Sequence, residues 1–310
     1  MASIAVFGYS RFTRRCVEGL ISLGYRVKLF CPRSDRATFD QAMQGMSVPA
    51  AYCDTLDGPE LHEAMTAFRP DFLLTIIFNH KVPDSVLEIP RHGALNVHPA
   101  PLPSFRTANA WFWPLREGVK RSEIAVHHMT AQWDRGNVLL RVPFDLHPLE
   151  TQGTYTSRVI ACAPALVRAL DPMLRTPPLP AGEPQGEGQY YRAVRLADLF
   201  IDFHESATRV DALVRACNPN HGAQALFRSR NIEISEVTPV NGPPDEPGTL
   251  HVHDNRLVVS CNDGLLELRV VKDPEEGVFS GERFAHLYAV TSGETLRSIS
   301  SLPGYRRFLE

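Results

Sequence analysis

The chain has 310 residues, of which 44% are hydrophobic and 22% charged, and its formal net charge is -3 at pH 7. A chain of this length and composition buries a sizeable core and is expected to fold as two globular domains. Residues 190–310 carry 13 Lys and Arg against 17 Asp and Glu, whereas a surface that neutralises phosphates is basic. The charge balance therefore argues against a nucleic-acid partner.

The amino terminus shows neither a basic region nor a long apolar one. Met1-Ala2-Ser3 leads directly into the short apolar run 4–7, and no stretch of about 18 apolar residues follows. We expect no membrane partner and a cytoplasmic location. The six cysteines form no Cys-x-x-Cys pair, so neither a disulfide framework nor a structural zinc site is expected.

Strands and helices alternate through the first half of the chain. Residues 3–8 predict a buried strand, residues 12–23 an amphipathic helix and residues 25–31 a second strand, which together form a βαβ unit. The alternation continues with helices expected at 58–68, 108–117 and 154–170 and strands at 71–77, 94–98, 123–129 and 138–144. This order predicts an α/β domain with a parallel sheet.

A Pro- and Gly-rich stretch at residues 171–188 interrupts this alternation. A helix is expected at 207–217, followed by short strands at 232–237, 249–253, 256–260 and 265–271, with the turn pairs Asp254-Asn255 and Asp263-Gly264 between the last three. We therefore predict an α/β domain at 1–175, a linker at 176–200 and a smaller β-rich, barrel-like domain at 201–310.

Gly8 follows the first strand, where a dinucleotide-binding fold carries its glycine fingerprint. No Gly-x-Gly-x-x-Gly is present, and the second strand ends Cys31-Pro32-Arg33 without the acid that holds a ribose. A nicotinamide-dependent dehydrogenase is therefore disfavoured. Gly8 by itself permits a tight turn from strand to helix.

Asn96 and His98 end a predicted strand, and Asp134 follows His98 by 36 residues. An amine that attacks a formyl carbon must lose a proton, and the developing oxyanion needs hydrogen-bond donors. A His base, an Asn donor and an Asp that orients the His supply both. Each residue alone also has an ordinary structural interpretation, as a hydrogen-bonded strand-end His, an Asn that satisfies local backbone groups and an Asp in a turn.

Other polar and aromatic residues near these positions carry weaker signals. His127 and His128 are adjacent on a predicted strand and point to opposite faces, so at most one joins a site and no metal centre is expected. Arg106 is interpreted as an anion clamp for a substrate, with an exposed loop charge as the alternative. The cluster Trp111-Phe112-Trp113 is interpreted as core packing, with one ring lining a pocket as the alternative.

Residues 93–106, 124–129 and 134–139 together resemble the formyltransferase family that uses 10-formyltetrahydrofolate. That family carries an Asn-x-His pair, a Leu-Pro-x-x-Arg-Gly loop and an Asp-x-Gly turn. The resemblance implies a Rossmann-like domain, an N-formyltransferase activity without a metal, and catalytic roles for Asn96, His98 and Asp134. Thr107 stands where the family loop has Gly, and Phe78-Asn79 stands where many members have Tyr-Gly.

The resemblance also implies binding residues on the segments that flank the catalytic strand. The expected contacts with the folate co-substrate are Phe78, Asn79, Val82, Leu102, Gly136 and Val138. The expected contacts with the acceptor amine are Arg106, Asn109 and Trp113.

Ile201-Asp202-Phe203 and residues 215–219 resemble the start of the carboxyl-terminal domain of methionyl-tRNA formyltransferases, an open barrel of the oligonucleotide-binding type. The acidic balance, and Asn109-x-x-x-Trp113 with His127, are more similar to members that formylate nucleotide-linked amino sugars. Such a sugar is the expected acceptor. The alternatives are hydroxyornithine or another natural-product amine, methionyl-tRNA, and a folate-binding module without catalysis. Homodimerisation through the barrel stays open.

Overall fold

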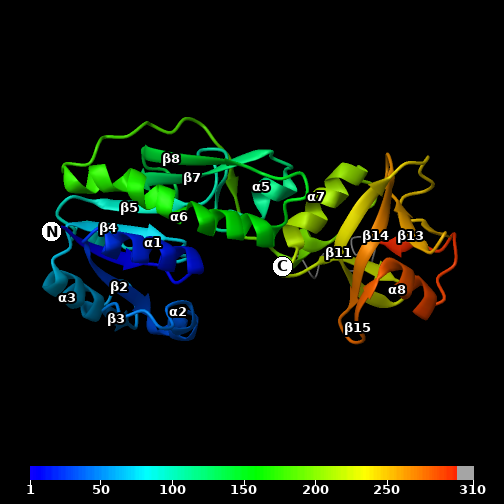
Figure 1. Cartoon of the computed structure of the whole chain (residues 1–310), viewed down its shortest axis with the longest axis horizontal. Helices are drawn as coiled ribbons and strands as arrows, with labels where there is room; N and C mark the ends of the chain where they lie inside the picture. Colours follow the sequence, from blue (N-terminus) through cyan, green and yellow to red (C-terminus); the bar gives the residue numbers. More distant parts are fainter. Residues whose placement is uncertain (299–310) are drawn as a thin grey trace. The chain divides into compact units, whose positions relative to one another are not determined.

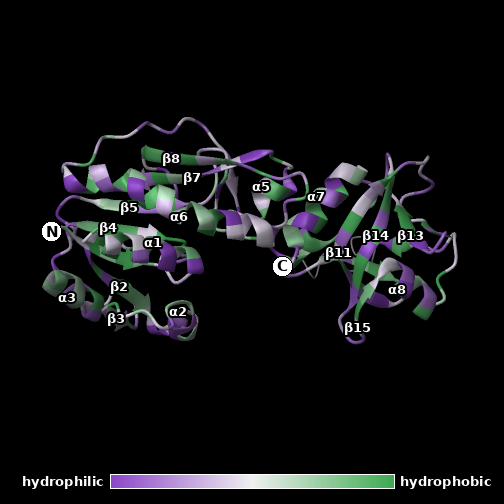
Figure 2. Cartoon of the chain, in the orientation of Figure 1, coloured by the Kyte–Doolittle hydropathy of each residue, from purple (hydrophilic) through white to green (hydrophobic). Residues whose placement is uncertain are grey.

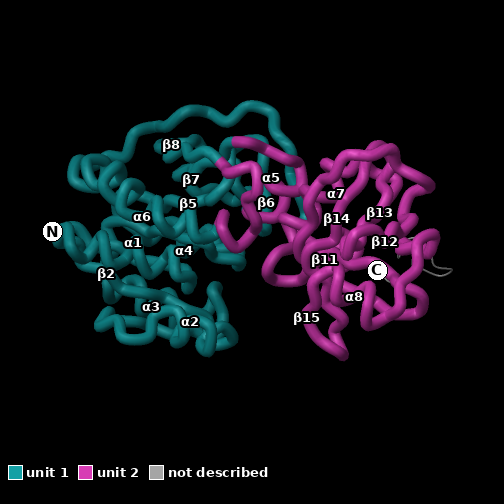
Figure 3. Tube along the Cα trace, turned by 45° about the vertical axis from the view of Figure 1, so that its right-hand side comes forward, with its two compact units in different colours: residues 1–110, 121–145, 156–192 teal, residues 111–120, 146–155, 193–310 magenta. Residues whose placement is uncertain are grey.

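The computed structural model describes residues 1–298, and the chain divides into two compact units (Figure 1). Unit 1 contains residues 1–110, 121–145 and 156–192, and unit 2 contains residues 111–120, 146–155 and those from 193 onward. The two colours in Figure 3 show that each unit draws on separate stretches of the sequence.

A mixed sheet with the strand order β3-β2-β1-β4-β5-β7-β8 forms the core of unit 1. The strands from β3 to β5 in this order run parallel, whereas β7 runs antiparallel to both of its neighbours, β5 and β8. The predicted Rossmann-like α/β class is confirmed, although the alternation of elements does not reveal the antiparallel pair. The strands are β1 (Ser3–Phe7), β2 (Arg26–Pro32), β3 (Ala50–Cys53), β4 (Phe72–Ile76), β5 (Ala94–His98), β7 (Arg121–His128) and β8 (Val138–Asp145).

Amphipathic helices pack on this sheet, and Figure 2 shows hydrophilic and hydrophobic residues alternating along them. Helix α1 begins after Ser10, whose side chain accepts a hydrogen bond from the Thr13 backbone N–H. Gly19 lets α1 pack directly on Val167 of α6. The helices are α1 (Arg11–Ser22), α2 (Arg36–Ala42), α3 (Pro59–Phe68), α4 (Asp84–Leu87) and α6 (Gln152–Arg175), with a 3-10 turn η1 (Arg33–Asp35).

Gly8 is required where β1 passes closest to β4. Its φ is 141°, and a Cβ at this position would lie 2.1 Å from the Ile76 carbonyl oxygen. Gly8→Ala is expected to lower the free energy of unfolding by more than the roughly 1–3 kcal/mol of a strained backbone, because the clash adds to the strain. Gly45→Ala measures the cost of the strained backbone alone. Gly45 also has a positive φ of 78°, but a Cβ added there would have nothing within 4 Å. The measurement is thermal unfolding of both variants. Equal losses in the free energy of unfolding would contradict this explanation.

The predicted helix at 108–117 is wrong. Only α5 (Trp113–Arg116) is helical in this stretch, and Pro114 lies in its first turn. Proline lacks the N–H and clashes with the preceding turn of a helix, so a helix that contains Pro114 must begin just before it. A short parallel pair of β6 (Arg106–Thr107) with β9 (Tyr190–Tyr191) also stands outside the prediction.

Unit 2 is built on an antiparallel sheet with the order β12-β13-β14-β11-β10-β16, with β15 paired to β14. Asp254 and Asn255 have φ of 49° and 62°, as expected for the predicted two-residue hairpin. The register of β11 shifts between Ile234 and Val237, and such bulges bend a strand. The predicted smaller β-rich, barrel-like domain is confirmed, as an antiparallel half-barrel sheet. Its elements are η2 (Leu196–Leu199), α7 (Ala207–Cys217), β10 (Ala223–Phe227), β11 (Arg230–Val240), β12 (Leu250–His253), β13 (Arg256–Ser260), β14 (Leu265–Asp273), β15 (Gly277–Ser280), α8 (Gly281–Leu287) and β16 (Leu296–Arg297).

Within residues 1–298, no helix is long and apolar enough to cross a membrane. All six cysteines lie in this part of the chain as free thiols, and all except Cys162 are buried.

Candidate active site

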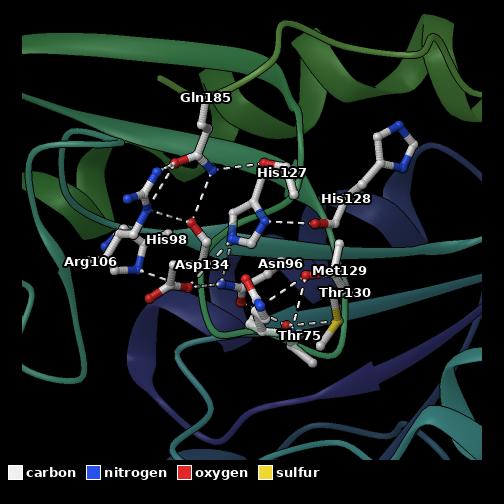
Figure 4. A network of polar contacts seen from close by, with 12 residues as sticks. Thr75, Asn96, His98, Arg106, His127, His128, Met129, Thr130, Asp134 and Gln185 are labelled. Atoms are coloured by element: carbon white, nitrogen blue, oxygen red, sulfur yellow. Dashed lines mark hydrogen bonds and ion pairs between the residues drawn. The ribbon is translucent and has the colours of Figure 1, made fainter. Parts of the chain in front are cut away.

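Asn96 and His98 lie on the same face of β5, because alternate residues of a strand point to the same side. In the register of the sheet, Asn96 lies directly opposite Thr75 of β4 and His127 of β7. Asp134, from the loop between β7 and β8, extends toward this face (Figure 4). The cluster thus forms at the carboxyl end of parallel strands, the edge at which open α/β sheets bind ligands.

The Asn96 amide is held in one orientation by its neighbours. The Thr75 hydroxyl donates to Asn96 Oδ1 at 2.6 Å, which places the amide nitrogen on the opposite side. Nδ2 donates to Asp134 Oδ1 at 3.1 Å and lies 3.0 Å from His127 Nε2. The hydrogen-bond network therefore assigns a donor, not an acceptor, to the centre of the cluster.

The protonation of His98 follows from its backbone partner. Nε2 lies 2.8 Å from the carbonyl oxygen of Phe105, and because a carbonyl only accepts, this nitrogen carries the proton. In the neutral ring, Nδ1 then holds the lone pair, and it lies 3.7 Å from Asp134 Oδ1. His98 therefore presents a basic nitrogen to the cluster, and the ring is only 5% exposed.

His127 takes the opposite tautomer. Its Nδ1 lies 2.7 Å from the His128 carbonyl oxygen and must donate to it, so in the neutral ring Nε2 accepts from Asn96. The same Nε2 lies 3.4 Å from Asp134 Oδ1. His128 points away from the cluster, as Figure 4 shows, and its Nε2 bonds the Pro180 carbonyl oxygen at 2.8 Å. The expectation that at most one of the two histidines joins a site is confirmed.

Asp134 has an unusual backbone and a stabilised negative charge. Its φ is 51°, in the left-handed region that few residues other than glycine adopt. Burial raises the pKa of the Asp134 carboxyl, but the positive charge of His98 when that ring is protonated, then the hydrogen bond and charge of protonated His127 and the hydrogen bond from Asn96, lower it by more. The resulting pKa lies below its ordinary value. Asp134 is therefore a carboxylate at neutral pH.

The backbone of the Asp134 loop is fixed from two sides. A Cβ on Gly136 would lie 1.8 Å from the His128 carbonyl oxygen, so only glycine allows the loop to pass this close to β7. From the other side, Gln185 Nε2 donates to the carbonyl oxygens of Asp134 at 2.9 Å and Gly136 at 2.7 Å. Gly136 thus has a clear structural role, whereas its expected folate contact stays a prediction.

Arg106 does not lie where an anion clamp for a substrate would lie. The residue is 1% exposed, and its guanidinium bonds Gln185 Oε1 and the carbonyl oxygens of Asp134, Gly186 and Gly188. Since the side chain is buried among protein acceptors, the structure contradicts the expected role. Thr107, in place of the family glycine, is buried in β6 and pairs with Tyr191.

Most of the expected folate contacts are buried in small apolar clusters. Phe78 and Val82 pack in one cluster of unit 1, and Leu102 and Val138 pack together in another, while Asn79 is exposed. Contact with a ligand would therefore use the small exposed parts of these side chains and the backbone beside them. Their assignment to a folate site stays a prediction.

Asn109 belongs to unit 1, where its backbone N–H donates to the Thr107 hydroxyl at 3.0 Å. Trp113 belongs to unit 2, where its ring lies edge-on against Phe112 at a centroid distance of 5.1 Å. No group of three or more His, Cys, Asp or Glu side chains within residues 1–298 is arranged to hold a metal.

The structure adds Thr75 and Gln185 to the cluster, and it selects His127 as the one of the two adjacent histidines that joins it. Thr75 and His127 each lie on a predicted strand next to the strand with Asn96. The pairing register of these strands, which places both residues opposite Asn96, would have identified them. Gln185 lies 51 residues beyond Asp134 in the Pro- and Gly-rich stretch, and nothing in the sequence signals its partner.

Two family models match this chain. The formyl transferase family matches residues 30–170, and the formyl transferase carboxyl-terminal domain matches residues 194–288. The chain belongs to the formyl transferase family. The first match covers β5, β7, β8 and the Asp134 loop, and the second covers most of the antiparallel sheet of unit 2.

Curated relatives match over most of the chain. A methionyl-tRNA formyltransferase of Dechloromonas aromatica is 29% identical over 271 residues, which cover 84% of this chain and 87% of the relative. The methionyl-tRNA formyltransferase of Thermotoga maritima is 23% identical, with coverage of 87% and 90%.

Solved structures share the fold. HypX from Aquifex aeolicus, in complex with tetrahydrofolic acid, matches with a TM-score of 0.64 at 17% identity, covering 93% of this chain. This chain spans 48% of the HypX chain, about half its length. An N-formyltransferase from Helicobacter canadensis, in complex with folinic acid and dTDP-3-aminofucose, matches with a TM-score of 0.67 at 12% identity, covering 86% of this chain and 99% of its own.

Proposed function

We propose that this enzyme transfers a formyl group from 10-formyltetrahydrofolate to the primary amine of a small molecule. The observation that carries the proposal is that the Asn96 amide and the His98 ring both lie beside one oxygen of the Asp134 carboxylate. Asn96 Nδ2 lies 3.1 Å and His98 Nδ1 lies 3.7 Å from Asp134 Oδ1. A fixed donor, a base and an ionised acid are the groups that acyl transfer to an amine needs.

Each residue has one task in the proposed reaction. As the amine nitrogen bonds to the formyl carbon, the formyl oxygen gains negative charge, and Asn96 Nδ2 donates a hydrogen bond to it. His98 Nδ1 accepts the proton that the amine loses. When the bond between the formyl carbon and N10 breaks, Asp134 helps to return one proton to N10, so tetrahydrofolate leaves neutral at that atom and the acceptor leaves as an N-formyl amide.

The choice of formyl donor is supported by family membership and by the ligands of structures with the same fold. HypX was solved with tetrahydrofolic acid, and the Helicobacter canadensis enzyme with folinic acid. In this chain, Asn96 is half-buried at the carboxyl end of β5, and its two Nδ2 hydrogens bond Asp134 Oδ1 and His127 Nε2. One of these two bonds must open for Asn96 to donate to the formyl oxygen. A pteridine donor bound at this edge would present its formyl group to Asn96 and His98.

For the acceptor, a nucleotide-linked amino sugar is the first candidate. It is supported by the acidic balance of residues 190–310 and by the amino-sugar ligand of the Helicobacter canadensis enzyme. Methionyl-tRNA is the second candidate, because the curated relatives carry that name and match over both parts of the chain. Hydroxyornithine and related small amines complete the set.

The test is an acceptor screen that follows tetrahydrofolate formation from 10-formyltetrahydrofolate, run separately with nucleotide-linked amino sugars, hydroxyornithine and initiator methionyl-tRNA. We expect acceptor-dependent turnover with one of the small amines. Turnover with methionyl-tRNA alone would overturn the choice of acceptor but keep the chemistry. Folate binding without turnover for any amine would favour a binding module instead.

A further inference from the structure

We infer that Gln185 is a positioning residue for formyl transfer, because it holds the Asp134 loop in the conformation that places the carboxylate beside Asn96 and His98. The inference rests on the proposed function for its activity readout. Gln185 touches none of the catalytic side chains directly, and acts through the backbone of the loop.

The Gln185 amide bonds on both sides. Nε2 donates to the carbonyl oxygens of Asp134 and Gly136 at 2.9 and 2.7 Å, and Oε1 accepts from Arg106 Nη2 at 2.9 Å and Nε at 3.2 Å. Because backbone carbonyls only accept and a guanidinium only donates, the amide has a single orientation that satisfies all four contacts. Figure 4 shows Gln185 between Arg106 and the loop.

Arg106 also bonds the backbone of the Asp134 loop. Its Nε also lies 3.2 Å from the Asp134 carbonyl oxygen, which therefore has two donors, and its terminal nitrogens bond the carbonyl oxygens of Gly186 at 3.1 Å and Gly188 at 3.5 Å. With the residue 1% exposed, these charge-assisted bonds are shielded from water and gain strength. Arg106 and Gln185 together fix the Asp134 carbonyl.

The segment that carries Gln185 is itself fastened on both sides. Before it, Glu183 and Val138 of β8 exchange two backbone hydrogen bonds of 2.7 and 2.9 Å. After it, Tyr190–Tyr191 pairs with β6, and the Tyr191 ring stacks on Phe105 at 5.3 Å. Gln185 is thus held in place by the pairing of its segment with β8 before it and with β6 after it.

Asp134 needs such support because its backbone is strained. A residue other than glycine in the left-handed region costs on the order of 1–3 kcal/mol and persists only where its surroundings over-determine it. If the loop relaxed, the carboxylate would leave the 3.1 Å contact with Asn96 and the 3.7 Å approach to His98. A displacement of about 1 Å can cost on the order of 10²-fold in rate.

The experiment compares Gln185→Leu, which removes both ends of the amide, with Gln185→Glu, which keeps an acceptor for Arg106 but removes the donors to the loop. Gln189→Leu is the matched control: the same substitution in the same segment, on an exposed side chain whose residue contributes its carbonyl oxygen to the Arg106 backbone N–H. For each protein, kcat and both KM values are measured, together with hydrogen exchange of the peptide covering residues 130–137.

We expect both Gln185 variants to lose kcat on the order of 10- to 100-fold, with KM for the folate and the amine within about threefold of wild type, a margin far smaller than the loss in kcat. Exchange of residues 130–137 should accelerate in both, while Gln189→Leu stays like wild type in every readout. Faster exchange with wild-type kcat would reduce Gln185 to a purely structural residue and overturn the inference. Wild-type kcat in Gln185→Glu would do the same, because the donors to the loop would then be dispensable.

Failure of the proposed function gives a different pattern. In that case the wild-type protein itself shows no turnover with any acceptor, before a variant is compared. The inference about catalysis falls with it, and the exchange data then report only on the loop.

Discussion

His98→Gln is expected to lower kcat/KM by on the order of 10²–10⁴-fold, the usual contribution of a positioned general base. Glutamine is the informative replacement. Its side-chain amide can keep the hydrogen bond that His98 Nε2 donates to the Phe105 carbonyl oxygen, but it has no basic nitrogen to face Asp134. The rate loss then reports on the base and not on an unsatisfied buried carbonyl, which would cost about 1–3 kcal/mol in stability. The measurement is steady-state kinetics with the acceptor identified in the screen.

His98→Ala separates the two effects further. It removes both the base and the bond to Phe105, so we expect the same loss of kcat/KM and a lower melting temperature than His98→Gln. His62→Ala is the control, because His62 is exposed on α3 and its loss should change neither quantity. Near-wild-type turnover in His98→Gln would show that another group takes the amine proton.

Asp134→Asn is expected to lower kcat by on the order of 10²–10⁴-fold, because an amide cannot accept or relay a proton. The replacement keeps an oxygen that can accept from Asn96 Nδ2 at the present 3.1 Å, so the loop should stay in place. The pKa of this carboxyl lies below its ordinary value, and a carboxyl with a depressed pKa is ionised at every pH above that value. The deficit should therefore be present from about pH 5 upward, and kinetics across this range test it.

Asp145→Asn provides the matched comparison for Asp134→Asn. Asp145 ends β8 in an exposed ion pair with Arg121, and removing such a pair costs about 1 kcal/mol or less. We expect wild-type kinetics from this variant. Activity in Asp134→Asn that equals the activity of Asp145→Asn would assign Asp134 to loop structure alone.

The sequence predicted the parts of the site that lie on one strand. Asn96 and His98 are two residues apart, and the strand period places them on one face whatever the rest of the fold does. The Asp-Asn pair at 254–255 likewise predicted a hairpin that the structure confirms. These successes share one feature, which is that the information is local.

The failures depend on contacts between distant residues. Arg106 was predicted to clamp a substrate anion, but its acceptors are the Asp134 carbonyl oxygen and groups some 80 residues away in the segment around Gln185. The predicted helix at 108–117 is wrong for a local reason, because Pro114 is disfavoured in the interior of a helix and limits α5 to Trp113–Arg116. The register that brings Thr75 and His127 beside Asn96 is a property of the folded sheet, which a single sequence leaves open.

The most direct test follows the formyl group itself. Wild-type enzyme and His98→Gln are incubated with 10-formyltetrahydrofolate labelled in the formyl carbon and with the accepted amine, and mass spectrometry measures the label on the amine nitrogen. The account predicts labelled N-formyl product from the wild type in step with tetrahydrofolate formation, and almost none from His98→Gln. Label that reaches the amine equally fast in both proteins, or that reaches no amine while tetrahydrofolate is still formed, would contradict it.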